Sequence, residues 1–160
     1  MDNEIIYGIR PIIEAIKADV KIDKIWLLQN KKNQLFKEVE SNDKKKKIEL
    51  KFKSNKKIDK LSGKIHQGAL AQIKPFALID FENLLKKNDK KKNQIYLLLD
   101  GITDVRNFGA IFRSALATDV IGIIVPENNS ASINSDTIKA SAGAIFYIPV
   151  SKVNHLNDAI

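Results

Sequence analysis

Apolar runs alternate with amphipathic stretches through the second half of the chain. Runs at residues 95–99, 121–125 and 145–150 have the length and the continuous apolar character of buried strands. The stretches between them, at 107–118 and 134–141, carry helical periodicity. Continuous apolar strands that are separated by helices predict a parallel sheet that is covered on both faces.

Shorter elements alternate in the first half. Pro11 suits the first turn of a helix, and Trp26 and Phe52 fall within strand patterns, so we expect both aromatic side chains in the core. The alternation predicts a small α/β unit over residues 1–75. Its periodicity indicates strands at 24–28, 48–53 and 69–74 and helices near 12–16, 31–40 and 58–61.

A change of composition separates the two halves. Residues 76–93 hold one short helical pattern, at Leu84-Leu85, and then a run of Lys, Asn and Asp. Such a segment is typical of a linker, so we predict one domain at 1–75 and a second at 94–160. A last helix opens at Asn154 and reaches barely one turn by the final residue, which indicates an incomplete second domain.

The charge is distributed as unevenly as the composition. The net charge is +8, and residues 1–93 hold 23 Lys and Arg against 13 Asp and Glu. A basic first half is typical of a protein that binds a polyanion. The alternative is a bias toward Lys that leaves the runs Lys44–Lys47 and Lys90–Lys92 as solvated loops, because 24 of the 27 basic residues are Lys.

Several classes of protein are disfavoured by composition. The chain has no Cys, and its two His stand far apart at 66 and 155, so we expect no disulfide and no metal site. No apolar run approaches the roughly 20 residues that span a bilayer, and the acidic N-terminus does not read as a secretory signal. A cytoplasmic protein with no membrane partner is the expectation.

The stretch 100–117 is the strongest candidate for a site. It follows a predicted strand, turns through a polar loop and enters a helix that Asn107 can cap. The absence of a side chain at Gly109 leads us to expect a close approach of the backbone to another group there. Arg113 is the single charged residue between 108 and 118, and a lone guanidinium needs water, a carboxylate or a phosphate.

The pattern Asp-x-x-Asn-x-Gly-Ala-Ile-x-Arg-Ser-Ala within this stretch resembles the first motif of the SpoU (TrmH-like) family of RNA 2′-O-ribose methyltransferases, in the SPOUT superfamily. The segments 126–131 and 141–144 match the loop and the small-residue turn that the family carries next. Tyr7-Gly8-Ile9 and His66-Gln67-Gly68 resemble its substrate-binding domain, a small α/β fold related to ribosomal RNA-binding proteins. The resemblance covers essentially the whole chain, and the nearest branch methylates a guanosine ribose in 23S rRNA.

The resemblance implies an activity and roles for particular residues. The activity is methyl transfer from S-adenosylmethionine to a ribose 2′-hydroxyl. Arg113 would stabilise the developing alkoxide and hold a phosphate, since a guanidinium is a poor base. Asn107 would orient Arg113 or the ribose, although helix capping alone also explains an Asn there. The implied RNA contacts are Tyr7, Arg10, His66, Gln67, Gly68 and Arg106.

Each of these RNA contacts has a structural alternative. Arg106 can belong to an ordinary polar loop, and Gly68 can serve only a turn with a special backbone angle. At the level of the whole protein, the alternatives to an rRNA methyltransferase are a tRNA ribose methyltransferase and a non-catalytic RNA-binding protein.

The chain also departs from the family pattern. The two later motifs of the family form the trefoil knot, the S-adenosylmethionine pocket and much of the dimer interface, and none of them follows Val150. We therefore expect a fragment of a longer, homodimeric enzyme: a parallel-sheet SPOUT domain (a knotted, Rossmann-like fold) without its knot region. We expect no cofactor-binding residue within this chain.

Overall fold

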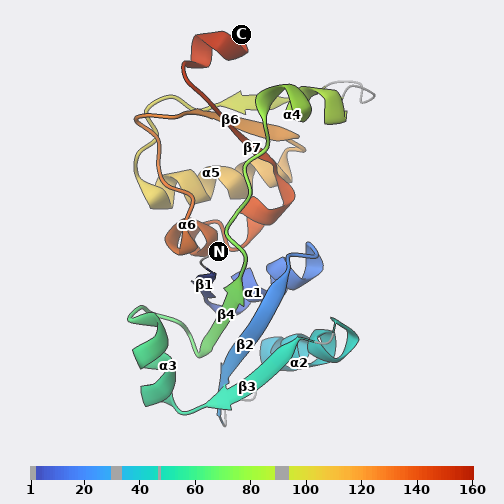
Figure 1. The fold of residues 1–160 in the computed structure, drawn as a ribbon, viewed down its shortest axis with the longest axis vertical. Helices are drawn as coiled ribbons and strands as arrows, with labels where there is room; N and C mark the ends of the chain where they lie inside the picture. The colour runs from blue at the N-terminus through green and yellow to red at the C-terminus, as the bar shows by residue number, and fades with distance from the viewer. Residues whose placement is uncertain (1–2, 30–33, 47, 89–93) are drawn as a thin grey trace. The chain divides into compact units, whose positions relative to one another are not determined.

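The computed structural model describes residues 3–29, 34–46, 48–88 and 94–160. The chain divides into two compact units, Met1–Pro75 and Phe76–Ile160, and Figure 1 traces each of them in turn. Within the described ranges, no helix is both long enough and apolar enough to cross a membrane.

The first unit is a four-stranded sheet with three helices (Figure 1). Its strands lie in the order β1-β4-β2-β3, where β2 and β3 are parallel and the other pairs are antiparallel. The strands are β1 (Glu4–Tyr7), β2 (Ile22–Leu28), β3 (Glu49–Lys53) and β4 (Ala69–Ile73). The helices are α1 (Ile9–Lys17), α2 (Gln34–Lys46) and α3 (Asn55–Ser62).

The two faces of this sheet are covered differently. Alternate residues of a strand point to opposite faces. Trp26 and Leu70 point to the face on which Ile58 of α3 packs. Their neighbours Ile25 and Ala71 are fully buried on the other face, where α1 and α2 contact the strands and each other. The small α/β unit that the sequence predicts is therefore confirmed.

Three details of the first unit differ from the sequence-based expectation. The strand β1 was not predicted, because Glu4–Tyr7 is too short to show a period. Phe52 is 48% exposed rather than in the core, since β3 is an edge strand; Trp26, on the inner strand β2, is 8% exposed as expected. Helix α2 continues through the lysines at 44–46, so these are not in a loop; Lys47, residues 31–33 and Lys90–Lys92 lie outside the described residues.

The second unit is built on a parallel sheet in the order β5-β6-β7. This confirms the predicted alternation of parallel strands and helices. The strands are β5 (Tyr96–Leu98), β6 (Gly122–Pro126) and β7 (Val150–Val153). The helices are α4 (Phe81–Asn88), α5 (Val105–Ala117) and α6 (Ser135–Ala140), with 3₁₀ helices at Ala144–Tyr147 and Leu156–Ala159.

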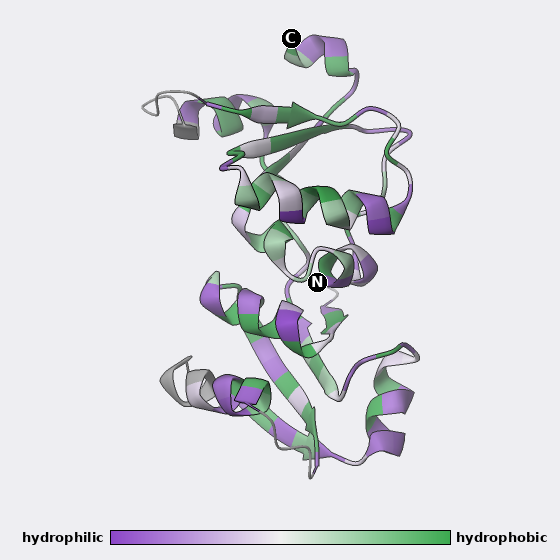
Figure 2. Cartoon of the chain, turned by 180° about the vertical axis from the view of Figure 1, so that it is seen from behind, coloured by the Kyte–Doolittle hydropathy of each residue, from purple (hydrophilic) through white to green (hydrophobic). Residues whose placement is uncertain are grey.

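Helices lie on both faces of this sheet. In Figure 1, α5 and α6 lie on one side of the strands and α4 on the other. Leu84 of α4 is fully buried and packs against Ile124 and Val153. Residues 76–88 are therefore part of the second unit, whereas the composition suggests a linker; residues 89–93 lie outside the described residues. Figure 2 shows hydrophobic residues concentrated on the strands that these helices cover.

The run at 145–150 is not a strand. It begins with the 3₁₀ helix Ala144–Tyr147, and β7 starts only at Val150. Gly143 has a φ of 90°, and its carbonyl accepts from the Phe146 N–H at 3.1 Å, which turns the chain tightly. Ile145 is fully buried all the same, so the apolar run reports burial and not extended backbone. The helix expected from Asn154 is likewise a short 3₁₀ helix.

Candidate functional site

The helix α5 begins at an aspartate and not at the asparagine of the motif. Asp104 is the N-cap: its Oδ1 accepts from the Asn107 N–H at 2.8 Å, and its carbonyl accepts from the Phe108 N–H at 2.9 Å. The prediction that Asn107 caps the helix is therefore wrong, because the helix starts two residues earlier, at Val105. Asn107 lies in the first turn, and its exposed side chain is not needed to start the helix.

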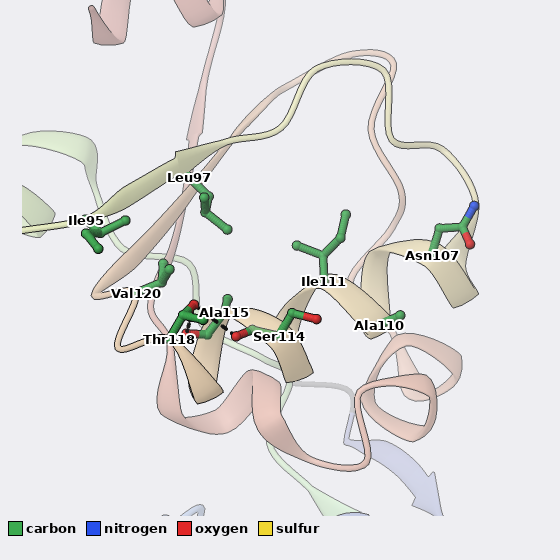
Figure 3. Close-up of a pocket in the computed structure, with 9 residues that line it drawn as sticks. All are labelled: Ile95, Leu97, Asn107, Ala110, Ile111, Ser114, Ala115, Thr118 and Val120. Atoms are coloured by element: carbon green, nitrogen blue, oxygen red, sulfur yellow. Dashed lines mark hydrogen bonds between the residues drawn. The ribbon is translucent and has the colours of Figure 1, made fainter.

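One stripe of α5 faces a pocket beside β5. The pocket has a volume of about 490 Å³ and is mostly apolar. Ile111 and Leu97 point toward one another across it, and Asn107 stands at its far end (Figure 3). Ser114 and Thr118 complete the polar lining, although the Thr118 hydroxyl already donates to the Ser114 carbonyl at 3.0 Å.

The two arginines of α5 lie on a different stripe. Successive residues of a helix are about 100° apart, so Arg106 and Arg113, seven residues apart, differ by only about 20°. Both are exposed, and the Arg106 side chain is 91% exposed, with its Nε 3.9 Å from Asp104 Oδ2. Arg113 does not line the pocket. The structure thus brings two predicted site residues, Arg106 and Arg113, to one helical face.

Asn107 is separated from that face. It lies six residues before Arg113, which places the two side chains about 120° apart around the helix. The geometry therefore gives no support to the expectation that Asn107 orients Arg113. Contact between Asn107 and the ribose stays a prediction, and the pocket stripe is the side from which such a contact would be made.

Gly109 allows α5 to touch the end of α6. A Cβ at Gly109 would lie 2.4 Å from the Ala140 Cβ and 2.7 Å from the Ser141 nitrogen. Ser141 is fully buried, and its hydroxyl donates to the Ile138 carbonyl at 2.9 Å. The close approach expected at Gly109 is therefore present, and its partner is α6. Ser141 and Gly143 act as turn structure beside α5, as their small size suggests.

Two motifs 60 residues apart meet in the first unit. Tyr7 of β1 pairs with Leu70 of β4, and the Gly8 N–H donates to the Ala69 carbonyl at 3.1 Å. The predicted contact residues Tyr7 and Gly68 are thereby brought to one end of the sheet. The Lys64 ammonium stands 5.3 Å from the centre of the Tyr7 ring, at cation–π distance. Arg10 is exposed on α1, which covers the other face of this sheet.

His66 is an interior residue of this first-unit site. It is 7% exposed; its Nε2 lies 2.8 Å from Asp59 Oδ1, and its Nδ1 accepts from the Gly68 N–H at 2.9 Å. These partners assign the proton to Nε2, because Nδ1 is used as an acceptor. Direct RNA contact through the His66 ring, which the resemblance implies, is disfavoured by this burial. Gln67 is exposed, at a φ of 54°, and Gly68 has the special angle expected, 88°.

The charges divide between the two units. Residues 1–75 hold 18 Lys and Arg against 10 Asp and Glu, whereas residues 76–160 hold nine of each. The whole net charge of +8 therefore resides in the first unit. In the part of the chain that the structure describes, no cluster of three His, Asp or Glu could hold a metal ion.

A cofactor contact is not assigned to any of these residues. The pocket beside α5 offers an amide and two hydroxyl groups and no charged side chain. S-adenosylmethionine carries a sulfonium and the two charges of an amino acid, and the described lining has no ionic partner for them. The pocket residues by themselves do not fit that cofactor.

Comparison with solved structures shows which known folds the chain resembles. The fold matches an S-adenosylmethionine-bound rRNA methyltransferase from Sinorhizobium meliloti with a TM-score of 0.75 at 19% identity, over 98% of this chain and 56% of that one. It also matches the SpoU methyltransferase AviRb from Streptomyces viridochromogenes, in complex with the same cofactor, at 0.73 and 20% identity, over the same 98% and 56%. The chain therefore shares the fold of these two methyltransferase structures.

Sequence comparison gives the family. Residues 5–78 match the substrate-binding domain of RNA 2′-O ribose methyltransferases, and residues 94–160 match the SpoU rRNA methylase family. The chain belongs to this SpoU (TrmH-like) family. It is 36% identical over its whole length to a TrmH-family tRNA/rRNA methyltransferase homologue of Staphylococcus aureus strain COL, and 32% identical over 96% of its length to one of Bacillus subtilis. It spans 65% and 62% of these relatives.

Proposed function

We propose that this protein methylates RNA, with S-adenosylmethionine as the methyl donor and a ribose 2′-hydroxyl as the acceptor. The observation that carries the proposal is the placement of Arg113, an exposed cation of the SpoU motif on α5, beside a second cation at Arg106. The basic first unit supports it, because that unit carries the whole net charge.

The chemistry explains why an arginine is needed. Methyl transfer forms a bond between the ribose oxygen and the methyl carbon while the bond from that carbon to the sulfonium sulfur breaks, and the hydroxyl proton passes to solvent water. Negative charge develops on the ribose oxygen as the proton leaves. A guanidinium is permanently charged, so Arg113 acts as an electrostatic stabiliser of that oxygen and not as a base.

Arg106 has a complementary role. Its side chain lies on the Arg113 face and is almost fully exposed, which suits contact with the phosphates on either side of the target nucleotide. Asn107, about 120° from Arg113 around α5, would reach the ribose from the pocket stripe. The first unit would capture structured RNA, and the complete enzyme would act as a homodimer.

The substrate proposed is a guanosine of 23S rRNA, by resemblance to that branch of the family. The names of the Staphylococcus and Bacillus relatives include tRNA as well as rRNA, so a tRNA ribose is the second candidate. A non-catalytic RNA-binding protein is the alternative from another class.

One experiment separates these candidates. The protein, expressed in the longest form that its gene encodes, is incubated with methyl-labelled S-adenosylmethionine and transcripts of 23S rRNA or tRNA. A 2′-O-methyl group blocks alkaline cleavage of the adjacent phosphodiester, so the modified nucleotide is mapped as a gap in the cleavage ladder. The proposal predicts one gap at a guanosine of 23S rRNA. Label on tRNA selects the second candidate, and RNA binding without label selects the third.

A further inference from the structure

We propose that RNA binds to the first unit on the side of the sheet that carries α3, and that the loop 63–68 is the apolar contact of that surface. We call this surface the α3 face; it comprises α3, the loop 63–68 and the side chains of β2 and β3 that point toward α3. The inference rests on the proposed function, because it takes RNA as the ligand, and it specifies where the RNA lies.

The register of the strands defines this face. Trp26 pairs with Lys51 and Leu28 with Lys53, and paired residues point to the same side of a sheet. Because Trp26 packs on Ile58 of α3, Lys51 and Lys53 also point to the α3 side. Lys24, two residues before Trp26, joins them and stands 5.9 Å from the centre of the indole ring.

The charge of the α3 face is strongly positive. Residues 49–68 contain six lysines and two carboxylates, and both carboxylates are occupied. Glu49 is held by Lys51 at 2.7 Å and Lys24 at 3.0 Å, and these two lysines lower the pKa of its carboxyl, Lys51 more than Lys24. Asp59 accepts from Asn55 at 2.9 Å and from His66 at 2.8 Å. The lysines of α3 therefore present positive charge that suits a polyanion.

On the opposite side of the sheet, helices cover the strands and one lysine is paired with carboxylates. There α1 and α2 cover the strands, and Lys17 of α1 contacts Glu38 of α2 at 3.0 Å and Glu14 at 3.5 Å. These contacts raise the pKa of Lys17, with the Glu38 hydrogen bond as the largest cause. Lys17 is thus paired with two carboxylates, whereas no acidic residue of α3 other than Asp59 lies among Lys56, Lys57 and Lys60.

The loop 63–68 is joined to α3 and β2 by a chain of hydrogen bonds, of which the bond from the Gly68 N–H to His66 is buried. Asn55, Asp59 and His66 form a chain that ends on the Gly68 N–H, and the Gly68 carbonyl accepts from the Leu28 N–H at 2.8 Å. Within this frame Ile65 is 80% exposed. Ile65 and Lys64 both line a pocket of about 620 Å³ that is open to solvent. An exposed isoleucine at this place can pack against the flat face of an unpaired base.

This arrangement assigns different roles to neighbouring residues. Lys56, Lys57 and Lys60 of α3 contact phosphates, Ile65 contacts an unpaired base, and His66 is a positioning residue that keeps Ile65 in place. A protein partner is disfavoured because the exposed apolar side chains Ile65 and Leu61 lie within a lysine-rich surface, and apolar groups together with cations suit the bases and phosphates of RNA.

The assignment is tested by measuring RNA dissociation constants by fluorescence anisotropy. Two labelled RNAs are compared: a stem–loop, and a fully paired duplex of the same stem. The double variant Lys56→Ala/Lys60→Ala is expected to weaken binding to both RNAs and to reduce the slope of log K against log salt by about one per lysine. Ile65→Ser is expected to weaken stem–loop binding about tenfold, with duplex binding and the salt slope unchanged. Glu49→Gln, which releases two lysines, is expected to tighten binding to both.

Matched controls lie elsewhere on the chain. Lys37→Ala removes an exposed lysine of α2, and Leu78→Ser removes a leucine that is 45% exposed in the second unit. Both are expected to bind RNA as the unsubstituted protein does. His66→Ala is expected to lose the stem–loop preference to the same extent as Ile65→Ser, and the double variant to lose no more, because both act through one loop. Thermal melts confirm that each variant is folded.

The outcomes are distinguishable from those for the proposed function. If Lys37→Ala weakens RNA binding and Lys56→Ala/Lys60→Ala does not, the α3 face is not the RNA-binding surface. Methyl transfer can continue in that case, so the proposed function is not contradicted. Retained stem–loop preference in Ile65→Ser overturns the role of the loop. RNA binding on the α3 face without methyl transfer by the longest gene-encoded form overturns the proposed function alone. No RNA binding by the unsubstituted protein overturns both.

Discussion

Arg106 and Arg113 lie on the same face of α5, seven residues and nearly two helical turns apart. The rise along these seven residues is about 10.5 Å, and both positions carry long, exposed side chains. In the proposed function, Arg113 lies at the ribose and Arg106 at a flanking phosphate.

The proposed function predicts different roles for the two arginines, RNA binding for Arg106 and methyl transfer for Arg113. Arg106→Ala removes a phosphate contact, so it is expected to weaken RNA binding and to lower the salt slope by about one, with the rate of methyl transfer at saturating RNA unchanged. Steady-state kinetics at several salt concentrations provide the measurement. Lys152→Ala, which removes an exposed cation from β7, is the control. A large fall in kcat for Arg106→Ala would place that side chain at the reacting atoms instead.

The start of α5 gives a second prediction. Asp104→Ala removes the side chain that caps the helix and is expected to lower the free energy of unfolding by about 1 kcal/mol. Asn107→Ala keeps the cap and is expected to leave stability within about 0.5 kcal/mol, while it reduces methyl transfer. Urea unfolding of both variants measures the difference. The reverse order of stabilities is incompatible with Asp104 as the N-cap.

The contact between α5 and α6 gives a third prediction. Gly109→Ala places a methyl group 2.4 Å from the Ala140 Cβ and against the backbone of Ser141, so one helix must move. The expected loss of stability is about 1–3 kcal/mol. Ala110→Ser, one residue along on an exposed position, is expected to be neutral. A thermal melt of Gly109→Ala that coincides with the parent protein would show that the two helices are not packed so closely.

The buried histidine gives a fourth prediction. His66→Ala leaves the Gly68 N–H without its acceptor and is expected to lower the free energy of unfolding by about 1–3 kcal/mol. His66→Asn puts an amide oxygen near the position of Nδ1 and is expected to recover part of that loss. Equal losses for the two variants, measured in urea, would mean that the hydrogen bond to Gly68 contributes nothing.

The sequence predicts more of the second unit's architecture than of its detail. Its long periodic segments specify parallel strands and helices because burial on both faces leaves continuous apolar runs. The run at 145–150 misleads for the same reason: Ile145 is buried whether the backbone is a strand or a 3₁₀ helix. A hydrophobic run shows that side chains are buried but not whether the backbone is a strand or a helix. Here the backbone hydrogen bond from the Phe146 N–H to the Gly143 carbonyl identifies the 3₁₀ helix.

The candidate site shows a similar division. The motif identifies Arg113, and Arg106 is expected only as an RNA contact from the loop before the helix. That the two share a helical face follows only from the start of α5 at Val105, which brings Arg106 into the helix. Both Asp104 and Asn107 are residue types that cap helices, and in the structure Asp104 is the N-cap. In the first unit, the sequence highlights His66, yet only the partners at Asp59 and Gly68 show that its ring is committed to the interior.

The role of Arg113 in methyl transfer is the central claim, and a single-turnover experiment tests it most directly. The longest gene-encoded form and its Arg113→Ala variant are mixed with methyl-labelled S-adenosylmethionine and limiting RNA, at concentrations where each protein binds all of the RNA. Loss of electrostatic stabilisation predicts a rate at least about 100-fold lower for the variant, with the modified ribose unchanged. A rate within about threefold of the parent would contradict the assignment of Arg113 to the developing alkoxide.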